Sequence, residues 1–162
     1  MNGLDVATAL GQMRLVGDHR GLRQLAFLQL ELEAPVSDPV DGGMENEACL
    51  MRAAIQLEAY AAGRLTEFDV RLNPQGTDFQ QRVWQALLAI PYGEVRSYKD
   101  IALAIGQPKA VRAVGGAIGQ NPIPLMIPCH RVVGADGSLT GFRWGLALKK
   151  RLLQLEGGLS RL

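Results

Sequence analysis

The sequence predicts an α/β protein of the α+β kind, with a small sheet and one helix in its first half and a mostly helical second half. Residues 7–30 alternate apolar and polar side chains between glycines, as short antiparallel strands joined by tight turns do. Residues 78–90 instead repeat apolar side chains every three or four positions, which is typical of an amphipathic helix. With 162 residues, 48% of them hydrophobic, the chain is able to bury a core in one ordinary domain or two small ones.

Composition excludes several classes of protein. No apolar run reaches the roughly 18 uncharged residues of a membrane helix, and no basic segment followed by an apolar core marks a signal for secretion. We therefore expect a cytoplasmic protein without a membrane partner. Two cysteines, Cys49 and Cys129, and two histidines, His19 and His130, are too few for a disulfide scaffold or a Cys-rich zinc site.

Charge is divided unevenly along the chain. Residues 1–78 carry 6 Lys and Arg against 12 Asp and Glu, whereas residues 79–162 carry 11 against 4. The basic second half is the part that is suited to bind a polyanion such as a nucleic acid, although charge alone favours the simpler explanation of a solvated basic surface.

The first half is predicted to be one sheet followed by one helix. Gly11, Gly17 and Gly21 have the spacing of turn residues between the strands. A run rich in proline, glycine and aspartate predicts a loop over residues 34–43, and apolar residues at helical spacing predict a helix over residues 45–62.

The end of this half is marked by chain breakers. The helix is expected to stop at Gly63, and residues 68–72 then alternate as a short strand. Asn-Pro-Gln-Gly at residues 73–76 indicates a domain boundary, which predicts an N-terminal domain over residues 1–75 with a structural role and with Cys49 in its core.

The C-terminal domain, residues 76–162, is predicted to be mostly helical. Thr77 opens a T-x-x-Q capping pattern at the start of the helix over residues 78–90. A last amphipathic helix over residues 145–156 sets five leucines against a basic face at residues 149–151.

Two short helices are expected between these. Ser97 opens a second capping pattern, S-x-x-D, for a helix that runs through Ile105, and a further helix runs from Lys109 to about Gly119. Two short helices across a tight turn have the form of a helix-turn-helix, a form that ordinary packed helix pairs share.

The second of these short helices contains unusually small residues. They are Ala110, Ala113, Gly115, Gly116 and Ala117. Each interior glycine costs about 1 kcal/mol relative to alanine, so something else must favour it. Close approach to a large surface and tight packing against another helix are both compatible with this composition. Arg112 is the one long cation among them, able to contact a phosphate, stack on a base or pair with an acid.

Cys129 lies at the end of a stiff apolar segment. Three prolines between Asn121 and Val133 predict an extended, buried path with little helix or ladder bonding. A cysteine in such surroundings is either an inert core residue or a nucleophile activated by a base, and His130 is adjacent. Neighbouring side chains of an extended chain point to opposite sides, so contact between the two requires a bend or a bridging water.

This segment carries a family resemblance. Residues 127–132, Ile-Pro-Cys-His-Arg-Val, resemble the I-P-C-H-R-V signature of the O6-alkylguanine-DNA alkyltransferases, also called methylated-DNA–protein-cysteine methyltransferases. Further segments resemble the family in the same order and spacing: residues 76–84, 91–94, 97–98, 112–115 and 121–122. The resemblance implies a winged helix-turn-helix in the C-terminal domain and covers residues 76–158, about half of the chain.

The resemblance also implies a reaction and its residues. Cys129 would accept the alkyl group from O6 of a guanine extruded from duplex DNA, once per molecule and without a cofactor. His130 would act through a water, with Glu156 orienting its imidazole. Asn121 would brace the turn beside the active site, and Tyr98 would press on the phosphate of the target nucleotide and donate to the leaving guanine.

DNA contacts follow from the same resemblance. Arg112 would fill the space of the extruded base, and its helix, with Lys109, Ala110, Ala113, Gly115 and Gly116, would enter the minor groove of double-stranded DNA largely independently of sequence. We expect a monomer. Cooperative binding along DNA and activity on O4-alkylthymine stay open.

The substrate pocket implied by the resemblance consists of Pro124, Phe142, Arg143 and Trp144. Phe142 stands where many members of the family have tyrosine, so a hydroxyl contact is lost while an apolar wall is kept. The Cys and His ligands that some relatives use for zinc in the N-terminal domain are not visible, which predicts no metal.

Two other functions remain as alternatives. A non-catalytic module that binds damaged DNA, like the alkyltransferase-like proteins, would lack the acceptor cysteine that this chain has. A cysteine hydrolase using Cys129 and His130 would turn over repeatedly and would need an oxyanion hole, of which the sequence bears no distinct sign.

Overall fold

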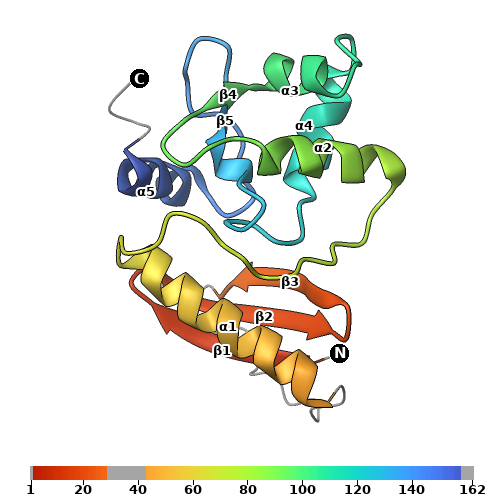
Figure 1. Ribbon diagram of the computed structural model, residues 1–162. Coiled ribbons are helices and arrows are strands. Elements are labelled where there is room, and N and C mark those ends of the chain that lie inside the picture. The colour runs from red at the N-terminus through yellow and green to blue at the C-terminus, as the bar shows by residue number, and fades with distance from the viewer. Residues whose placement is uncertain (1, 29–42, 158–162) are drawn as a thin grey trace. The chain divides into compact units, whose positions relative to one another are not determined.

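The computed structural model of the protein describes residues 2–28 and 43–157. Its elements form two compact units, Met1–Gln75 and Gly76–Leu162, which divide within the Asn-Pro-Gln-Gly run. Figure 1 shows the sheet and one long helix in the first unit and several short helices in the second. The α+β class expected from the sequence is confirmed.

The N-terminal unit is an antiparallel sheet covered by one helix. Strands β1 (Asn2–Thr8), β2 (Gly11–Asp18) and β3 (Gly21–Phe27) are hydrogen-bonded in the order β1-β2-β3. Helix α1 (Gly43–Ala61) packs against the sheet (Figure 1). Alternate residues such as Met13, Leu15 and Leu25 are fully buried beneath it, as period-two patterning requires.

The sheet differs from expectation in two places. It begins at Asn2 rather than Ala7. Gly17 is not a turn residue but lies inside β2, where the pairing with β3 shifts register between Val16 and Gly17. Glycine is common at such irregularities because it has no side chain to pack. Of the predicted loop over residues 34–43, only Gly43 is described, and it starts α1.

The predicted strand over residues 68–72 was wrong. Only a single bridge joins Leu72 to Leu22, with the amide of Leu22 donating to the carbonyl of Arg71 at 2.8 Å. A Cβ at Gly21 would lie 2.6 Å from that same carbonyl oxygen, so the approach depends on glycine. Cys49 is half-buried rather than a core residue, which corrects a second expectation.

The C-terminal unit starts with the capped helix that the sequence predicts. Helix α2 (Asp78–Leu88) carries the complete Thr77–Gln80 capping box. Its buried Trp84 donates its indole N–H to the carbonyl of Ala117 at 2.9 Å, which joins α2 to α4 in the core of this unit. The element ends just before Ile90 and Pro91, close to the predicted stop.

Helices α3 (Tyr98–Ala104) and α4 (Val111–Gly119) form the expected pair. Ser97 and Asp100 make a complete capping box on α3. The start of α4 at Lys109 was wrong, because residues 107–110 form a turn closed by the amide of Ala110 and the carbonyl of Gln107, with Pro108 at the turn position that proline favours.

The remaining elements are short strands, one turn of helix and one long helix. Strand β4 (Arg96–Ser97) pairs in parallel with β5 (Val132–Val133). Strand β5 follows directly after the 3-10 turn η2 (Cys129–Arg131). Helix α5 (Leu146–Glu156) contacts η2 and ends at Gly157 in the left-handed conformation. The predicted basic face of α5 was partly wrong, because Lys149 is fully buried and Leu146 is 47% exposed.

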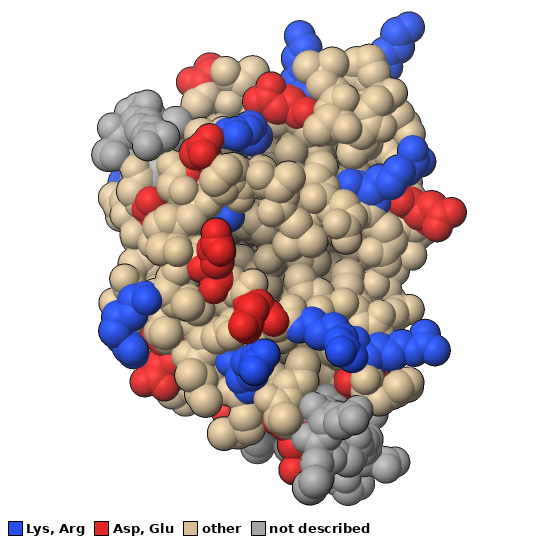
Figure 2. All heavy atoms as spheres, viewed as in Figure 1, with Lys and Arg blue, Asp and Glu red and all other residues tan. Residues whose placement is uncertain are grey.

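Charge and hydropathy of the surface add two observations. Figure 2 shows Lys and Arg side chains dispersed over this face, at its edge and farther in, among Asp, Glu and other residues. Within residues 2–28 and 43–157, no helix combines the length and the apolar character needed to cross a bilayer.

Candidate active site

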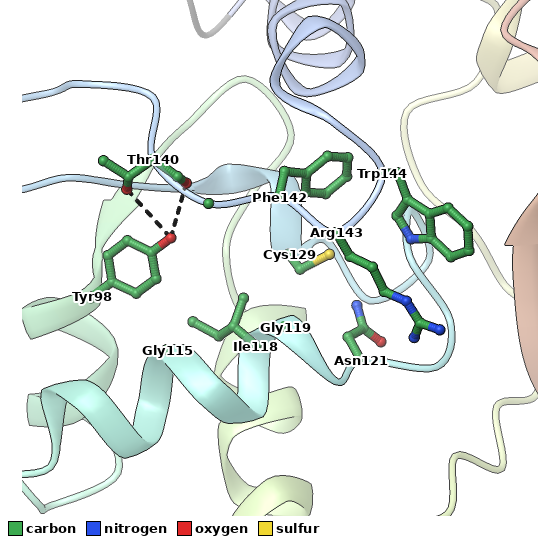
Figure 3. A pocket seen from close by; sticks show the side chains of 11 residues that line it. Tyr98, Gly115, Ile118, Gly119, Asn121, Cys129, Thr140, Phe142, Arg143 and Trp144 are labelled. Carbon is green, nitrogen blue, oxygen red and sulfur yellow. Dashed lines mark hydrogen bonds between the residues drawn. The ribbon is translucent and has the colours of Figure 1, made fainter.

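A pocket of about 500 Å³ in the C-terminal unit contains Cys129. In Figure 3 the sulfur of Cys129 points into this pocket, with the ring of Phe142 above it and the turns of α4 below. The lining consists of Tyr98 from α3, residues of the second half of α4, and a loop that precedes α5. These residues are Tyr98, Gly115, Ile118, Gly119, Asn121, Cys129, Thr140, Gly141, Phe142, Arg143 and Trp144.

The thiol is placed by a turn and not by an extended chain, which corrects the expectation from the three prolines. Cys129, His130 and Arg131 form the 3-10 turn η2, and all three are buried. The turn gives the bend that an extended segment lacks. Asn121 braces the approach to it, because its amide donates to the carbonyl of Ile127 at 2.8 Å and its carbonyl accepts from the amide of Ile123 at 3.0 Å.

The ring of His130 is held from one side. Its Nε2 lies 2.8 Å from Oε2 of Glu156, and both side chains are fully buried. An ionised carboxylate only accepts hydrogen bonds, so Nε2 carries the proton and Nδ1 keeps its lone pair. That Nδ1 is buried and has no hydrogen-bond partner among the described residues. The imidazole therefore presents a free basic nitrogen one residue from the thiol.

Arg131 is a site residue that sequence reasoning missed. Its Nε and Nη2 contact Oε1 and Oε2 of Glu156 at 2.8 and 3.0 Å, and its Nη1 donates to the carbonyl of Ile90 at 2.7 Å. Burial by itself raises the pKa of Glu156, but the hydrogen bonds from His130 and Arg131 and the charge of the guanidinium outweigh it and lower that pKa to about 2. The sequence could have indicated this role, because Arg131 lies in a segment that was predicted to be buried and a buried cation requires an anionic partner.

The thiol is protonated at rest. Burial raises the pKa of Cys129 to about 11, against the opposing effects of the Asn121 hydrogen bond and the charge of Lys149. Burial lowers the pKa of His130 below its usual value, against the opposing effect of Glu156, so the imidazole is neutral and able to take a proton. A protonated thiol one residue from a neutral imidazole is an arrangement that suits general-base activation.

Lys149 is the second site residue that the sequence analysis missed. Its ammonium donates to the carbonyls of Thr140 and Gly141 at 2.8 and 3.4 Å, so it holds two residues of the pocket wall. Burial lowers its pKa to about 8, partly offset by a thiolate at Cys129. The sequence did contain a sign that Lys149 is buried, because its spacing places it on the same helical face as Leu152, Leu153 and Glu156.

A buried lysine predicts a specific dependence of stability on pH. In the unfolded chain Lys149 keeps its proton up to a pKa of about 10.5, the ordinary value for lysine, whereas the folded protein releases it above about 8. Between these values the unfolded state binds more protons, so the free energy of unfolding rises with pH, by about 2 kcal/mol from pH 8 to roughly 9.5. The raised pKa of Cys129 acts in the opposite direction above pH 9, so urea denaturation should be measured on Cys129→Ala.

The matched control is Cys129→Ala combined with Lys149→Met. This double variant should show no rise over the same interval. Equal slopes in both proteins would contradict the assignment of the effect to Lys149.

The other predicted pocket residues are placed as follows. Phe142, Arg143 and Trp144 line the pocket, and the guanidinium of Arg143 lies 5.0 Å from the centre of the Trp144 ring. Tyr98 stands on the opposite wall and donates its hydroxyl to the carbonyl of Thr140 at 3.1 Å (Figure 3). Pro124 is buried but does not line the pocket, so the structure does not bring it together with the others.

Apart from Tyr98 on α3, the predicted DNA-binding residues lie on or just before α4. Arg112, Ala113 and Lys109 are exposed, whereas Ala110 caps the helix and is half-buried. A Cβ at Gly116 would meet nothing within 4 Å. Packing inside this unit therefore does not explain the small residues of the exposed face. Gly115 faces the pocket, where a Cβ would lie 3.9 Å from the Tyr98 ring.

No group of three or more His, Cys, Asp or Glu in the described parts of the chain is arranged to hold a metal ion.

Comparison with known proteins places the chain in a family. Residues 78–158 match the 6-O-methylguanine DNA methyltransferase DNA binding domain, and residues 6–74 match the ribonuclease-like domain of the same proteins. The methylated-DNA–protein-cysteine methyltransferase of Methanosarcina barkeri is 50% identical over 151 residues, 93% of this chain and 94% of that protein. The protein of that name from Mycolicibacterium paratuberculosis is 56% identical over 151 residues, 93% and 89% of the two chains.

A solved structure agrees with this placement. Mycobacterium tuberculosis OGT in complex with DNA superimposes with a TM-score of 0.83 at 48% identity, over 97% of this chain and 93% of that one. The fold is that of a DNA-repair alkyltransferase. The chain belongs to the 6-O-methylguanine DNA methyltransferase family.

Proposed function

We propose that the protein is a methylated-DNA–protein-cysteine methyltransferase that repairs O6-alkylguanine in double-stranded DNA by moving the alkyl group to Cys129. The observation that carries the proposal is the thiol at the base of the pocket, one residue from a buried imidazole whose free nitrogen is set by Glu156. The relatives that share this family over nearly the whole chain bear the name of the same activity.

The depth of the thiol requires the target base to leave the helix. Cys129 is only 6% exposed, and the O6 substituent of a stacked guanine lies within the major-groove edge of its base pair. Extrusion costs a few kcal/mol, less for a base whose pairing is already damaged. The pocket of about 500 Å³ has room for a purine, with Phe142 as an apolar wall for its alkyl group.

The transfer is a displacement at carbon. Nδ1 of His130 takes the thiol proton through a bridging water, and the sulfur forms a bond to the alkyl carbon as the bond from that carbon to O6 breaks. The electron pair of the broken bond goes to the guanine, which takes up a proton, and Tyr98 is the donor we assign to it. Since the hydroxyl of Tyr98 donates to Thr140 in the free protein, it must exchange that partner for the substrate.

The product is a thioether on Cys129, which a second nucleophile would have to remove. The other cysteine, Cys49, belongs to the other unit, and the lining of the pocket contains no other thiol. Each molecule therefore acts once, without a cofactor.

Helix α4 is the element we assign to the minor groove of the DNA. Its exposed small residues allow close approach, and Arg112 is positioned on the same helix to occupy the space of the extruded base. Contacts from the other basic residues of this unit would go to phosphates and would be largely independent of sequence. We assign the protein to the cytoplasm as a monomer.

Labelled substrate tests the function directly. Duplex DNA carrying O6-methylguanine with a labelled methyl group should transfer one label per protein, located on the Cys129 peptide by mass spectrometry. Tight binding without label would instead indicate a damage-binding module. Release of more than one product per protein would indicate a hydrolase.

A substitution on α4 separates binding from stability. Gly116→Leu places a side chain where the free protein has open space, so the free protein should gain up to about 1 kcal/mol of stability from helix propensity. The same side chain should hold the helix away from the minor groove and lower DNA affinity about tenfold or more, since about 1.4 kcal/mol is tenfold. Denaturation and fluorescence anisotropy with duplex DNA measure the two effects.

Gln154→Leu on α5 is the control for added apolar surface, because Gln154 is exposed and far along the chain from α4. It should leave DNA affinity unchanged. Unaltered affinity in Gly116→Leu would contradict the placement of α4 in the groove.

A further inference from the structure

We infer that Arg131 is a positioning residue for alkyl transfer, because its guanidinium keeps Glu156 ionised and thereby holds His130 in the tautomer that carries its proton on Nε2 and leaves Nδ1 basic. This inference rests on the proposed function. Arg131 shares the 3-10 turn with Cys129 and His130. Three consecutive residues therefore provide the alkyl acceptor, the base that takes its proton and the cation that contacts Glu156.

The geometry around Glu156 makes the carboxylate depend on this cation. Its side chain is fully buried and lies against Nε and Nη2 of Arg131 at 2.8 and 3.0 Å and Nε2 of His130 at 2.8 Å. Arg131 makes its two contacts in the two-pronged form that matches a carboxylate. The neutral imidazole brings no charge, so it is Arg131 that supplies a full positive charge in direct contact with the buried anion.

Arg131 is itself held firmly. Its Nη1 donates to the carbonyl of Ile90 at 2.7 Å, and its guanidinium lies 5.7 Å from the centre of the Tyr92 ring. The guanidinium is thus fixed by Glu156, by the backbone at the end of α2 and by an aromatic face. A cation so constrained orients the carboxylate plane as well as neutralising it.

The protonation state of Glu156 decides which nitrogen of His130 is basic. An ionised Glu156 accepts from Nε2–H and leaves the lone pair on Nδ1, the ring nitrogen that has no hydrogen-bond partner among the described residues. A protonated Glu156 becomes a donor, so Nε2 turns into the acceptor and the proton moves to Nδ1, where it blocks proton transfer from the thiol. Without the guanidinium, burial favours the protonated acid.

Other ionisable groups near Glu156 do not replace Arg131. Tyr92, on the segment after α2, interacts with both Glu156 and Arg131, and its raised pKa keeps it neutral. Lys149, which is buried on α5 like Glu156, donates to the carbonyls of Thr140 and Gly141. Its charge disfavours a cationic His130. The thiol of Cys129 is neutral at rest and adds no charge.

The test is the dependence of single-turnover transfer on pH. Arg131→Met should transfer at least about tenfold more slowly than the unaltered protein at pH 6, up to the roughly 10⁴-fold that a wrong tautomer costs in a serine protease. The deficit should shrink as pH is raised to 9, because Glu156 ionises again. Arg131→Lys keeps the charge and should show a ratio to the unaltered protein that does not change with pH.

The possible outcomes separate the inference from the proposed function. Failure of the unaltered protein to transfer the label overturns the proposed function. A deficit in Arg131→Met that is constant across pH, or no deficit, overturns the inference alone, since loss of a purely structural contact would not recover with pH.

A second measurement does not depend on the variant folding. In the unaltered protein, nitrogen NMR of His130 should show a protonated Nε2 and an unprotonated Nδ1 at pH 7 to 8, and the Glu156 carboxyl carbon should not titrate between pH 5 and 8. The opposite tautomer, or titration of Glu156 above pH 5, overturns the inference.

Discussion

Replacing Cys129 with serine should abolish alkyl transfer while leaving the fold and DNA binding in place. Serine differs by one atom at a position that is 6% exposed, so it fits the site without new contacts. Its hydroxyl is a far weaker acid and nucleophile than a thiol, and the neighbouring imidazole is a base of only moderate strength. We expect the rate to fall by at least about 10⁴-fold, given that removal of the nucleophile of subtilisin costs on the order of 10⁶.

The measurement is transfer of labelled methyl groups under single-turnover conditions, with DNA affinity measured in parallel. Cys49→Ser is the matched control, because it makes the same exchange at the other cysteine, half-buried in the N-terminal unit. It should react at the unaltered rate. Retention of rapid transfer by Cys129→Ser, or its loss in Cys49→Ser, would overturn the assignment of the acceptor.

Glu156→Gln is expected to have the second-largest effect, on rate and stability together. Glutamine can donate a hydrogen bond to Nε2 of His130, which places the proton on Nδ1, and the corresponding exchange in a serine protease costs about 10⁴-fold in rate. It also leaves the buried guanidinium of Arg131 without its counter-charge. Breaking a buried ion pair from one side costs about 3–5 kcal/mol.

Thermal and urea unfolding and the single-turnover assay measure the two effects separately. Glu94→Gln is the matched control, because Glu94 belongs to the same unit and its ion pair with Arg96 is partly exposed to solvent, with the Glu94 side chain 41% exposed. It should change stability by no more than about 1 kcal/mol. A Glu156→Gln protein that transfers at the unaltered rate would remove the carboxylate from the mechanism.

The helices of the C-terminal unit could be predicted because their signals act within one turn of chain. Thr77 and Ser97 each bond a backbone amide three residues on, and the buried residues of α2 repeat at helical spacing whatever covers them. Elements that depend on distant partners were less predictable. Residues 68–72 alternate like a strand, yet only Leu72 finds a partner, because the chain meets β3 at a single point.

The site shows the same division. Cys129 and His130 are recognisable as adjacent residues of one motif, and the resemblance supplied Glu156. The extended path to the thiol was wrong, because prolines restrict single dihedral angles but do not exclude the 3-10 turn that follows Pro128. The sequence pattern places Lys149 on a solvated basic face together with its neighbours Lys150 and Arg151. Nothing in three consecutive basic residues shows which of them the tertiary structure buries.

Sequence alone determined the family and indicated the main helices, and it predicted Cys129 as the acceptor, because these depend on residue identity and on spacing along the chain. Tertiary structure decided which groups carry charge. The pKa of a side chain depends on burial and on partners brought from elsewhere, as when α5 places Glu156 against η2 and Lys149 against the pocket wall. Those contacts, and not the motif, set the protonated thiol, the neutral imidazole and the ionised carboxylate on which transfer depends.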